Sequence, residues 1–221
     1  MKIVAFVPLK LNNERLSDKN IKSFDNGKPL MTYILETLRK IRIINEVFVF
    51  CSQDSIRKYL PPGVTYLTRS ETLDSSTTKI NEVIESFVNK VDADIYILAH
   101  ATAPFLSKKS IIQGIDAVLS KQYDSAFSVQ KLQEFLWDTK GPINYDLTNI
   151  PRTQDLPLIY SETTGLYIFT EKLLKEHKRR IGFNPYMIEV SKIEAIDINT
   201  YEDFFVANAV YNEINKNDKN T

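Results

Sequence analysis

The chain has 221 residues, of which 43% are hydrophobic, and its 28 lysines and arginines balance its 28 aspartates and glutamates. A chain of this length can bury a sizeable core and suits one large domain. The balanced charge gives no reason to expect a nucleic acid as partner, and no apolar run approaches the roughly 18 residues of a membrane span. The strand pattern begins directly after Met1 without a signal peptide, so the cytoplasm is the default expectation.

Short apolar runs alternate with helical patterns through residue 129. The predicted strands are 3–7, 47–51, 64–67, 94–99 and 125–129, and the predicted helices are 29–42, 54–60, 77–90 and one that Ser107 caps. This alternation predicts an α/β fold with a mostly parallel sheet and helices on both faces. The lone cysteine, Cys51, closes the second strand, and we expect a buried structural thiol there.

The segment of about 132–160 has no sustained period and contains several prolines. A loop that long inside a compact domain is usually functional or is stabilised by another chain. Its aromatic residues Phe135 and Trp137 are either anchors of such an interface or fold back onto their own core. After it we expect a strand at 165–169, a helix at 171–177, a strand at 186–190, a closing helix from about 200 and a frayed polar tail at 215–221.

A long basic loop follows the first predicted strand, which ends at Pro8. It carries Lys10, Arg15, Lys19 and Lys22. In an open α/β sheet, ligands bind where a loop leaves the carboxyl end of a strand. Four cations there suit a polyphosphate, although a basic loop taken alone is more often a solvated surface.

The spacing of this loop resembles a known pattern, I-P-A-R-G-G-S-K-R-I-P-x-K-N-I followed by G-K-P-L. Pro8, Lys10 and Arg15 match without a gap, as do Lys19-Asn20-Ile21 and Gly27-Lys28-Pro29-Leu30. The pattern belongs to the cytidylyltransferases that activate acidic sugars, the CMP-sialic acid and CMP-Kdo synthetases. At least five ordered segments carry the resemblance, which spans nearly the whole chain.

The resemblance implies a single Rossmann-like nucleotidyltransferase domain over 1–221, whose arm at about 132–160 helps to build a homodimer and part of the partner's site. It also implies transfer of CMP from CTP to a small anionic acceptor with Mg²⁺ as cofactor. Lys10, Lys19 and Asp197 are the implied catalytic residues. The implied nucleotide-binding residues are Leu9, Lys10, Asn12, Arg15, Lys19, Asn20, Arg69 and Ser76.

The middle of the basic loop departs from the family pattern. Leu11-Asn12-Asn13 replaces glycine-glycine-serine, which removes the residues that let backbone N–H groups approach phosphate most closely. Asparagine tolerates left-handed backbone and compensates in part. Glu14 replaces a lysine and would repel a triphosphate unless it pairs with Arg15 or turns outward.

The implied metal site is Asp197 with Asn199, followed by Asp203-Phe204, where the family reads D-I-D-T-x-x-D-F. Residues two apart on an extended segment project to one side, so both side chains could face one ion. Mg²⁺ takes one or two protein carboxylates, so asparagine at the second position weakens the site without disabling it. Alone, such a pair is more often a helix cap.

Base recognition is expected near Arg69, which begins a segment similar to the family's R-P-x-x-L. Ser75 and Ser76 are its predicted companions, and the aspartate usual in this stretch is not matched in register. The alternative is a serine-rich loop that caps a helix at Thr77 or Thr78.

The acceptor is expected beside His100, which stands where the family has glutamine before T-x-P. It could bind an acceptor hydroxyl, pair with an acidic group when protonated, or be structural. Arg152, Gln154 and Tyr160 match a second acceptor segment more loosely. Glu162 is unusual beside an acid-sugar pocket and suggests an altered acceptor, such as one that bears an amino group.

The predicted function is Mg²⁺-dependent CMP transfer from CTP to an acidic sugar for surface polysaccharide, with release of pyrophosphate. A phosphorylated small metabolite is the alternative acceptor. A non-catalytic nucleotide-binding relative is the alternative class, motivated by Leu11, Asn12, Glu14 and Asn199. A sugar-phosphate nucleotidyltransferase that uses another base is disfavoured because the chain lacks a G-x-G-T-R-type opening.

Overall fold

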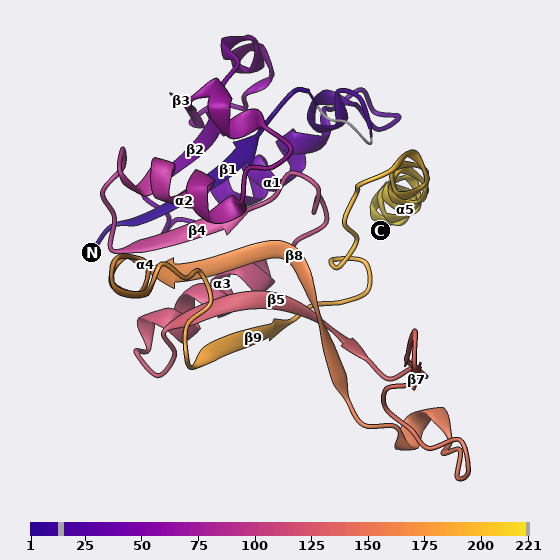
Figure 1. The fold of residues 1–221 in the computed structure, drawn as a ribbon. Coiled ribbons are helices and arrows are strands. Elements are labelled where there is room, and N and C mark those ends of the chain that lie inside the picture. The colour runs from indigo at the N-terminus through magenta and orange to yellow at the C-terminus, as the bar shows by residue number, and fades with distance from the viewer. Residues whose placement is uncertain (13–15, 220–221) are drawn as a thin grey trace.

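A computed structural model describes residues 1–12 and 16–219, which form a seven-stranded sheet with helices on both faces (Figure 1). The strand order is β3-β2-β1-β4-β8-β5-β9. The bounds are β1 Ile3–Leu9, β2 Glu46–Cys51, β3 Thr65–Thr68, β4 Ile95–Ala99, β5 Ser125–Leu132, β8 Ile159–Thr170 and β9 Pro185–Glu189. All pairs are parallel except those of β8, which runs antiparallel to both β4 and β5.

The helices follow the predicted positions closely. They are α1 Leu30–Arg39, α2 Ile80–Val88, α3 Lys108–Leu119, α4 Glu171–His177 and α5 Tyr201–Lys219, with 3₁₀ turns η1 Lys19–Ile21, η2 Asp54–Tyr59, η3 Glu71–Asp74 and η4 Thr153–Asp155. Ser107 caps α3 as predicted, its hydroxyl accepting from the Ser110 N–H. The tail predicted to fray at 215–221 is instead helical through Lys219, and residues 220–221 lie outside the described residues.

The core has two layers because the strands alternate. In β1, Ala5 and Val7 face the layer that α1 and α3 cover, whereas Val4 and Phe6 face the layer of α2 and α4. Burial of both faces explains why the strand reads as a continuous apolar run. Cys51 is fully buried and free, as predicted, and burial raises the pKa of its thiol.

The antiparallel strand β8 is the feature that the α/β alternation missed. It returns from the arm between β4 and β5, with a bulge in β5 between Phe127 and Val129. Thr164 in its middle has left-handed backbone, with φ of 58°. β8 pairs with β5 on both sides of this bend, through 159–162 before it and 167–169 after it.

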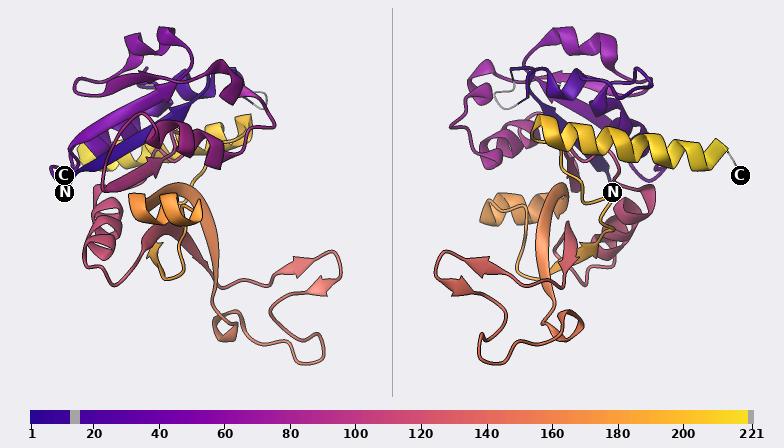
Figure 2. Two further views of the ribbon diagram at one scale, coloured as in Figure 1. Left: turned by 60° about the vertical axis from the view of Figure 1, so that its left-hand side comes forward. Right: turned by 90° about the vertical axis from the view of Figure 1, so that its right-hand side faces the viewer.

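The arm, residues 133–158, projects from the body and carries the short strand pair β6 Trp137–Asp138 and β7 Gly141–Pro142 together with η4 (Figure 2). Trp137 is 57% exposed, and its indole N–H donates to the Tyr145 hydroxyl within the arm. The Phe135 ring also packs on Tyr145, with centroids 4.8 Å apart. Phe135 and Trp137 therefore pack within the arm, and the alternative that they fold back onto the core is wrong.

The start of α5 is held beside the first loop by an aromatic cluster. The Phe24 ring is buried among Tyr33, Phe105, Phe204 and Tyr211, with centroids 5.2 to 6.2 Å away. This packing places the segment that precedes α5 next to the loops that follow β1 and β4.

Candidate active site

Most of the predicted site residues lie in the segments that follow β1, β3 and β4 or precede α5. In Figure 1 the loop after β1, the start of α5 and the base of the arm lie on the same side of the molecule. The Ile198 N–H donates to the Thr102 carbonyl at 2.9 Å, and the His100 N–H donates to the Gly165 carbonyl at 3.1 Å. These bonds join the segment of Asp197, the loop after β4 and the bend of β8.

A pocket of about 240 Å³ opens at the end of β1. Leu9, Lys10, Arg69 and Ser76 line it, and His100 contributes from the end of β4. The structure thus gathers four of the predicted nucleotide-binding residues around one cavity.

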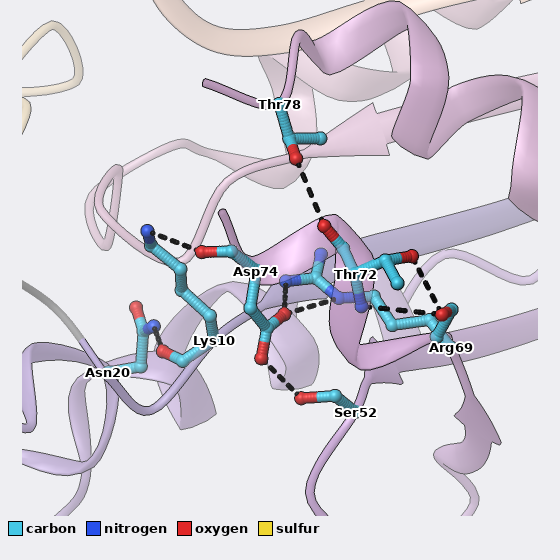
Figure 3. Close-up of polar contacts among 8 residues, drawn as sticks. Lys10, Asn20, Ser52, Arg69, Thr72, Asp74 and Thr78 are labelled. Carbon is cyan, nitrogen blue, oxygen red and sulfur yellow. Dashed lines mark hydrogen bonds and ion pairs between the residues drawn. The ribbon is translucent and has the colours of Figure 1, made fainter. Parts of the chain in front are cut away.

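Arg69 is held in this pocket by a carboxylate that the sequence analysis did not select. Its guanidinium contacts Asp74, with Nη2 2.5 Å and Nε 3.2 Å from Oδ1, and the Ser52 hydroxyl donates to Oδ2 at 2.6 Å (Figure 3). The side chains of Arg69 and Asp74 are only 4% and 10% exposed. A buried pair with its remaining oxygen satisfied is a fixed unit, so Arg69 is held in position before any ligand arrives.

The same turn positions Lys10. Its ammonium donates to the Asp74 backbone carbonyl at 3.2 Å, and the Asn20 amide donates to the Lys10 carbonyl at 2.9 Å (Figure 3). Asn20 therefore supports the loop backbone. Arg69, Lys10 and Asn20 are connected through η3 into one network.

The hydroxyls of the serine-rich turn also serve local structure, as the alternative interpretation proposed. The Ser70 hydroxyl accepts from the Thr72 N–H, and the Ser75 hydroxyl accepts from the Thr77 N–H, each at 3.3 Å. Helix α2 begins after them, at Ile80. Ser76 is exposed at the pocket.

Lys19 reaches the predicted metal position. Its side chain is buried, and Nζ donates to Asn199 Oδ1 at 3.3 Å. Asn199 Nδ2 in turn donates to Asp197 Oδ2 at 2.6 Å. Asp203 accepts the N–H groups of Asn199 and Thr200, so it caps α5 and holds the Asp197 segment.

The donor set fits Mg²⁺ through one carboxylate. Within residues 1–12 and 16–219, no three His, Cys, Asp or Glu side chains are placed to share a metal ion. Mg²⁺ often takes a single protein carboxylate and fills its remaining positions with water and substrate phosphate, which suits Asp197. The amide oxygen of Asn199 faces Lys19 and would have to turn over to reach an ion at Asp197. Its role as a ligand stays a prediction.

His100 is neutral at physiological pH. Its Nε2 atom is buried and has no hydrogen-bond partner in the described part of the chain. Burial, together with the charges of Arg180 and Lys19, lowers the pKa of the imidazole to about 4 against the opposing effect of Asp197. The protonated role is therefore disfavoured, and Nε2 is available for one hydrogen bond to a ligand.

The other predicted acceptor residues lie on the arm or near its base. The Arg152 side chain is 73% exposed and pairs with Asp155 in the same turn. Gln154 and Tyr160 are exposed as well. None of these three side chains is among the described residues that line the pocket at the end of β1.

Glu162 is already engaged by its own chain. Its carboxylate accepts a short hydrogen bond from the Tyr167 hydroxyl and contacts Arg180 Nη2 at 3.4 Å. Burial raises the pKa of Tyr167, and the bond to Glu162 adds to this effect. Arg180 was not selected from the sequence because it lies in a loop without a motif.

Two predicted nucleotide-binding residues remain in the basic loop, Asn12 and Arg15. Asn12 is exposed. Arg15, together with Asn13 and Glu14, lies outside the described residues, so its predicted contact with nucleotide remains a prediction.

Solved structures define the class of fold. A CMP:2-keto-3-deoxy-manno-octonic acid synthetase complexed with CTP superposes with a TM-score of 0.71 at 13% identity, over 96% of this chain and 99% of that chain. The 4-diphosphocytidyl-2C-methyl-D-erythritol synthase of Anaerococcus prevotii gives 0.69 at 14% identity, over 96% and 98%. The chain thus has the Rossmann-like α/β fold of nucleotidyltransferases, as predicted.

A family model described as Cytidylyltransferase matches residues 4–217. The chain belongs to the cytidylyltransferase family, which confirms the family resemblance found in the sequence.

Curated relatives are similar at low identity. N-acylneuraminate cytidylyltransferase A of Danio rerio is 26% identical over 215 residues, 93% of this chain and 50% of the relative. A Helicobacter pylori protein named pseudaminic acid cytidylyltransferase and UDP-2,4-diacetamido-2,4,6-trideoxy-beta-L-altropyranose hydrolase is 23% identical over 220 residues, 95% and 42%. The chain spans about half the length of these relatives. Among the described residues, no helix has the length and apolar character to cross a bilayer.

Proposed function

We propose that this protein transfers CMP from CTP to an oxygen of an acidic sugar and releases pyrophosphate. The observation that carries the proposal is the convergence of a preformed pocket around Arg69 with two lysines and Asp197 at one edge of the sheet. The match of the cytidylyltransferase family model to residues 4–217 supports the choice of base.

In the proposed reaction, the acceptor oxygen attacks the α-phosphorus of CTP. A new P–O bond forms, the bond to the β-phosphate bridge breaks, and pyrophosphate leaves with its electrons. Lys10 and Lys19 provide positive charge for the triphosphate, and Arg69 borders the space for the base. A Mg²⁺ ion held by Asp197 would neutralise charge on the phosphates when bound.

The acceptor is proposed to be a carboxylate-bearing sugar, a class used for surface polysaccharides. The relatives are named for N-acylneuraminate, pseudaminic acid and 3-deoxy-manno-octulosonate, which are all acids of this kind. The Nε2 atom of the neutral His100, which no described residue contacts through a hydrogen bond, suits a hydroxyl or carboxylate oxygen of such a sugar.

The protein is also proposed to act as a homodimer joined through the arm. Apolar side chains along the arm remain exposed in one chain: Phe135, Trp137, Ile143, Leu147, Ile150 and Leu158. An ordered projection with this many exposed apolar groups is stabilised when a second copy covers them. Arg152 and Gln154 lie on the same projection, so a dimer could bring them to the partner's pocket.

The test is pyrophosphate release from each of the four nucleoside triphosphates with Mg²⁺ and a panel of N-acetylneuraminate, pseudaminate, 3-deoxy-manno-octulosonate and phosphorylated polyols. We expect turnover with CTP and one acid. Turnover only with a phosphorylated polyol would replace the acceptor. CTP binding in calorimetry without turnover on any acceptor would contradict the enzymatic proposal and favour a nucleotide-binding subunit.

A further inference from the structure

Arg180 lies on a loop that the protein holds firmly. The loop leaves α4 through Lys178, whose φ of 54° turns the chain sharply. The Asp124 carboxylate accepts the N–H groups of Phe183 and Asn184 at 2.6 and 3.0 Å, and the Ser125 hydroxyl accepts the Gly182 N–H at 2.8 Å.

The tight approach of Asp124 requires glycine at position 182, because a Cβ there would collide with the carboxylate. Asp124 and Ser125 thus fix the backbone of residues 182–184, directly after Arg180. A side chain on a backbone fixed in this way leaves the loop in a defined direction.

The guanidinium of Arg180 is held in one orientation, but few of its N–H donors are engaged by the described residues. It lies 3.7 Å from the centroid of the Tyr167 ring, which fixes its plane, and its side chain is 20% exposed. Within the described residues, Nη2 contacts Glu162 at 3.4 Å, and the guanidinium also interacts with the Tyr167 hydroxyl. A guanidinium has five N–H donors, so most of its donor capacity is left for another acceptor.

The unused donors of Arg180 lie on the same side of the sheet as His100. Tyr167 pairs with Leu98 across β4 and β8, and both belong to the core layer of α2. His100 lines the pocket together with Ile80 and Val83 of α2, which belong to that same layer. The charge of Arg180 also contributes to the low pKa of His100, which is consistent with this proximity.

Glu162 and Tyr167 act as the support of Arg180 in this arrangement. The Tyr167 hydroxyl holds Glu162, and Glu162 meets the guanidinium at one corner only. A carboxylate engaged in this way is poorly placed to bind an amino group of the acceptor. The presence of Glu162 near an acid-sugar site is therefore better explained by its contact with Arg180 than by an acceptor that bears an amino group.

We propose that Arg180 binds the carboxylate of the acceptor, with the His100 imidazole as a neighbouring hydrogen-bond donor. The inference rests on the proposed function and names the specificity-determining residue of its acceptor side. The pair of donors suits a planar anion, which accepts two parallel N–H bonds from a guanidinium.

The experiment compares wild type, Arg180→Gln, Arg180→Lys and the matched control Arg179→Gln. Arg179 is in the same loop, but it packs on the Phe183 ring and donates to Gly182. Pyrophosphate release is measured with CTP, Mg²⁺ and each acid of the panel, and with the methyl ester of the best acid. Calorimetric binding of the acids is measured in parallel.

For Arg180→Gln we expect the KM for the acid to rise roughly 10- to 100-fold, because the variant loses a charge-assisted hydrogen bond to the carboxylate. The KM for CTP should stay unchanged, which also reports that the site is folded. Arg180→Lys should recover part of the affinity, and only Arg180→Gln should lose the preference of acid over ester.

Two outcomes separate the two proposals. If wild type neither binds nor uses any acid, the proposed acceptor is wrong and the carboxylate assignment fails with it. If wild type uses an acid but both Arg180 variants keep its KM within twofold and keep the preference over the ester, the role of Arg180 is wrong while the function stands.

Discussion

The nucleotide side and the acceptor side of the candidate site differ in how completely one chain builds them. On the nucleotide side, Arg69, Asp74 and Ser52 form a buried unit, and Lys10 joins it through η3. On the proposed acceptor side, Arg152 is exposed on the arm, whereas His100 Nε2 is buried and has no hydrogen-bond partner among residues 1–12 and 16–219.

This difference indicates that the two proposed substrates are bound in different ways. The pocket proposed for the nucleotide is formed before binding because its polar groups satisfy one another. The acceptor side holds donors that the described residues leave unused, and its remaining predicted residues lie on a projection. It is completed by the acceptor and, under the dimer proposal, by the partner chain.

The largest expected effect is at the point where the two sides meet. Asp197→Ala removes the carboxylate that we propose as the Mg²⁺ ligand and should lower kcat about 1000-fold, because metal stabilisation of a phosphoryl-transfer transition state amounts to several kcal/mol. Pyrophosphate release measures it. Asp116→Ala on the exposed face of α3 is the control. Near-normal turnover of the Asp197 variant would remove this residue from the metal site.

Breaking the nucleotide side should cost stability as well as affinity. Asp74→Ala leaves Arg69 buried and unpaired, so we expect a loss of about 3 kcal/mol in the free energy of unfolding and a KM for CTP roughly tenfold higher. Denaturant unfolding and steady-state kinetics measure these effects.

Asp54→Ala is the matched control for this change, because it breaks another Arg–Asp pair whose aspartate is 74% exposed. It should change stability by less than about 0.5 kcal/mol. Equal effects of the two substitutions would show that Asp74 does not hold Arg69 in place.

The arm prediction tests whether the acceptor side needs a second chain. Trp137→Ser should weaken the dimer by about 2 kcal/mol, roughly 30-fold in Kd, since exposed aromatic anchors dominate interfaces. Sedimentation velocity over a concentration series measures it. Phe183→Ser, also exposed but away from the arm, should leave the dimer unchanged. A wild-type monomer at high concentration would contradict the proposal.

The smallest effect concerns the segment that leads to Asp197. The Glu194 carboxylate accepts hydrogen bonds from the Ser107 N–H and the Ser110 hydroxyl. Burial raises the pKa of this carboxyl group, but the hydrogen bonds lower it by more. The pKa of Glu194 therefore lies below the ordinary value of 4.5. Glu194→Gln should therefore reduce the free energy of unfolding at pH 7 by about 1 kcal/mol.

The sign of its pH dependence follows from the lowered pKa. The stabilisation by Glu194 is complete above the unfolded value of 4.5 and is lost as pH falls through the folded pKa. The gap between wild type and variant should thus close in acid. A gap that stays constant from pH 7 down to pH 3 would show that packing, and not the charge, is responsible.

Most of the fold was predictable because its strands and helices carry strong periodic patterns. The run before Pro8 and the α2 positions Val83, Ile84 and Phe87 are buried as expected. The direction of β8 was not predictable, because apolar periodicity is the same for parallel and antiparallel strands. The continuation of α5 to Lys219 was also missed, since a polar composition does not reveal a helix end.

The candidate site was predictable where a motif carried it and not where tertiary contacts do. Lys10, Arg69 and Ser76 were selected from the family pattern and line one pocket. Asp74 lies out of register with that pattern, and Arg180 stands in a loop without one. Their importance depends on contacts across 5 and 18 residues of sequence, to Arg69 and to Glu162, which spacing alone does not show.

The position of β8 also determines the order in which the protein can be assembled during synthesis. The strands β1 to β4 emerge first and can pair among themselves, yet β4 keeps an open edge until β8 arrives. The whole arm must leave the ribosome before that edge is covered, because β8 ends only at Thr170. Nascent chains stalled within the arm would therefore present an apolar strand edge, the kind of surface on which chaperones act and aggregates begin.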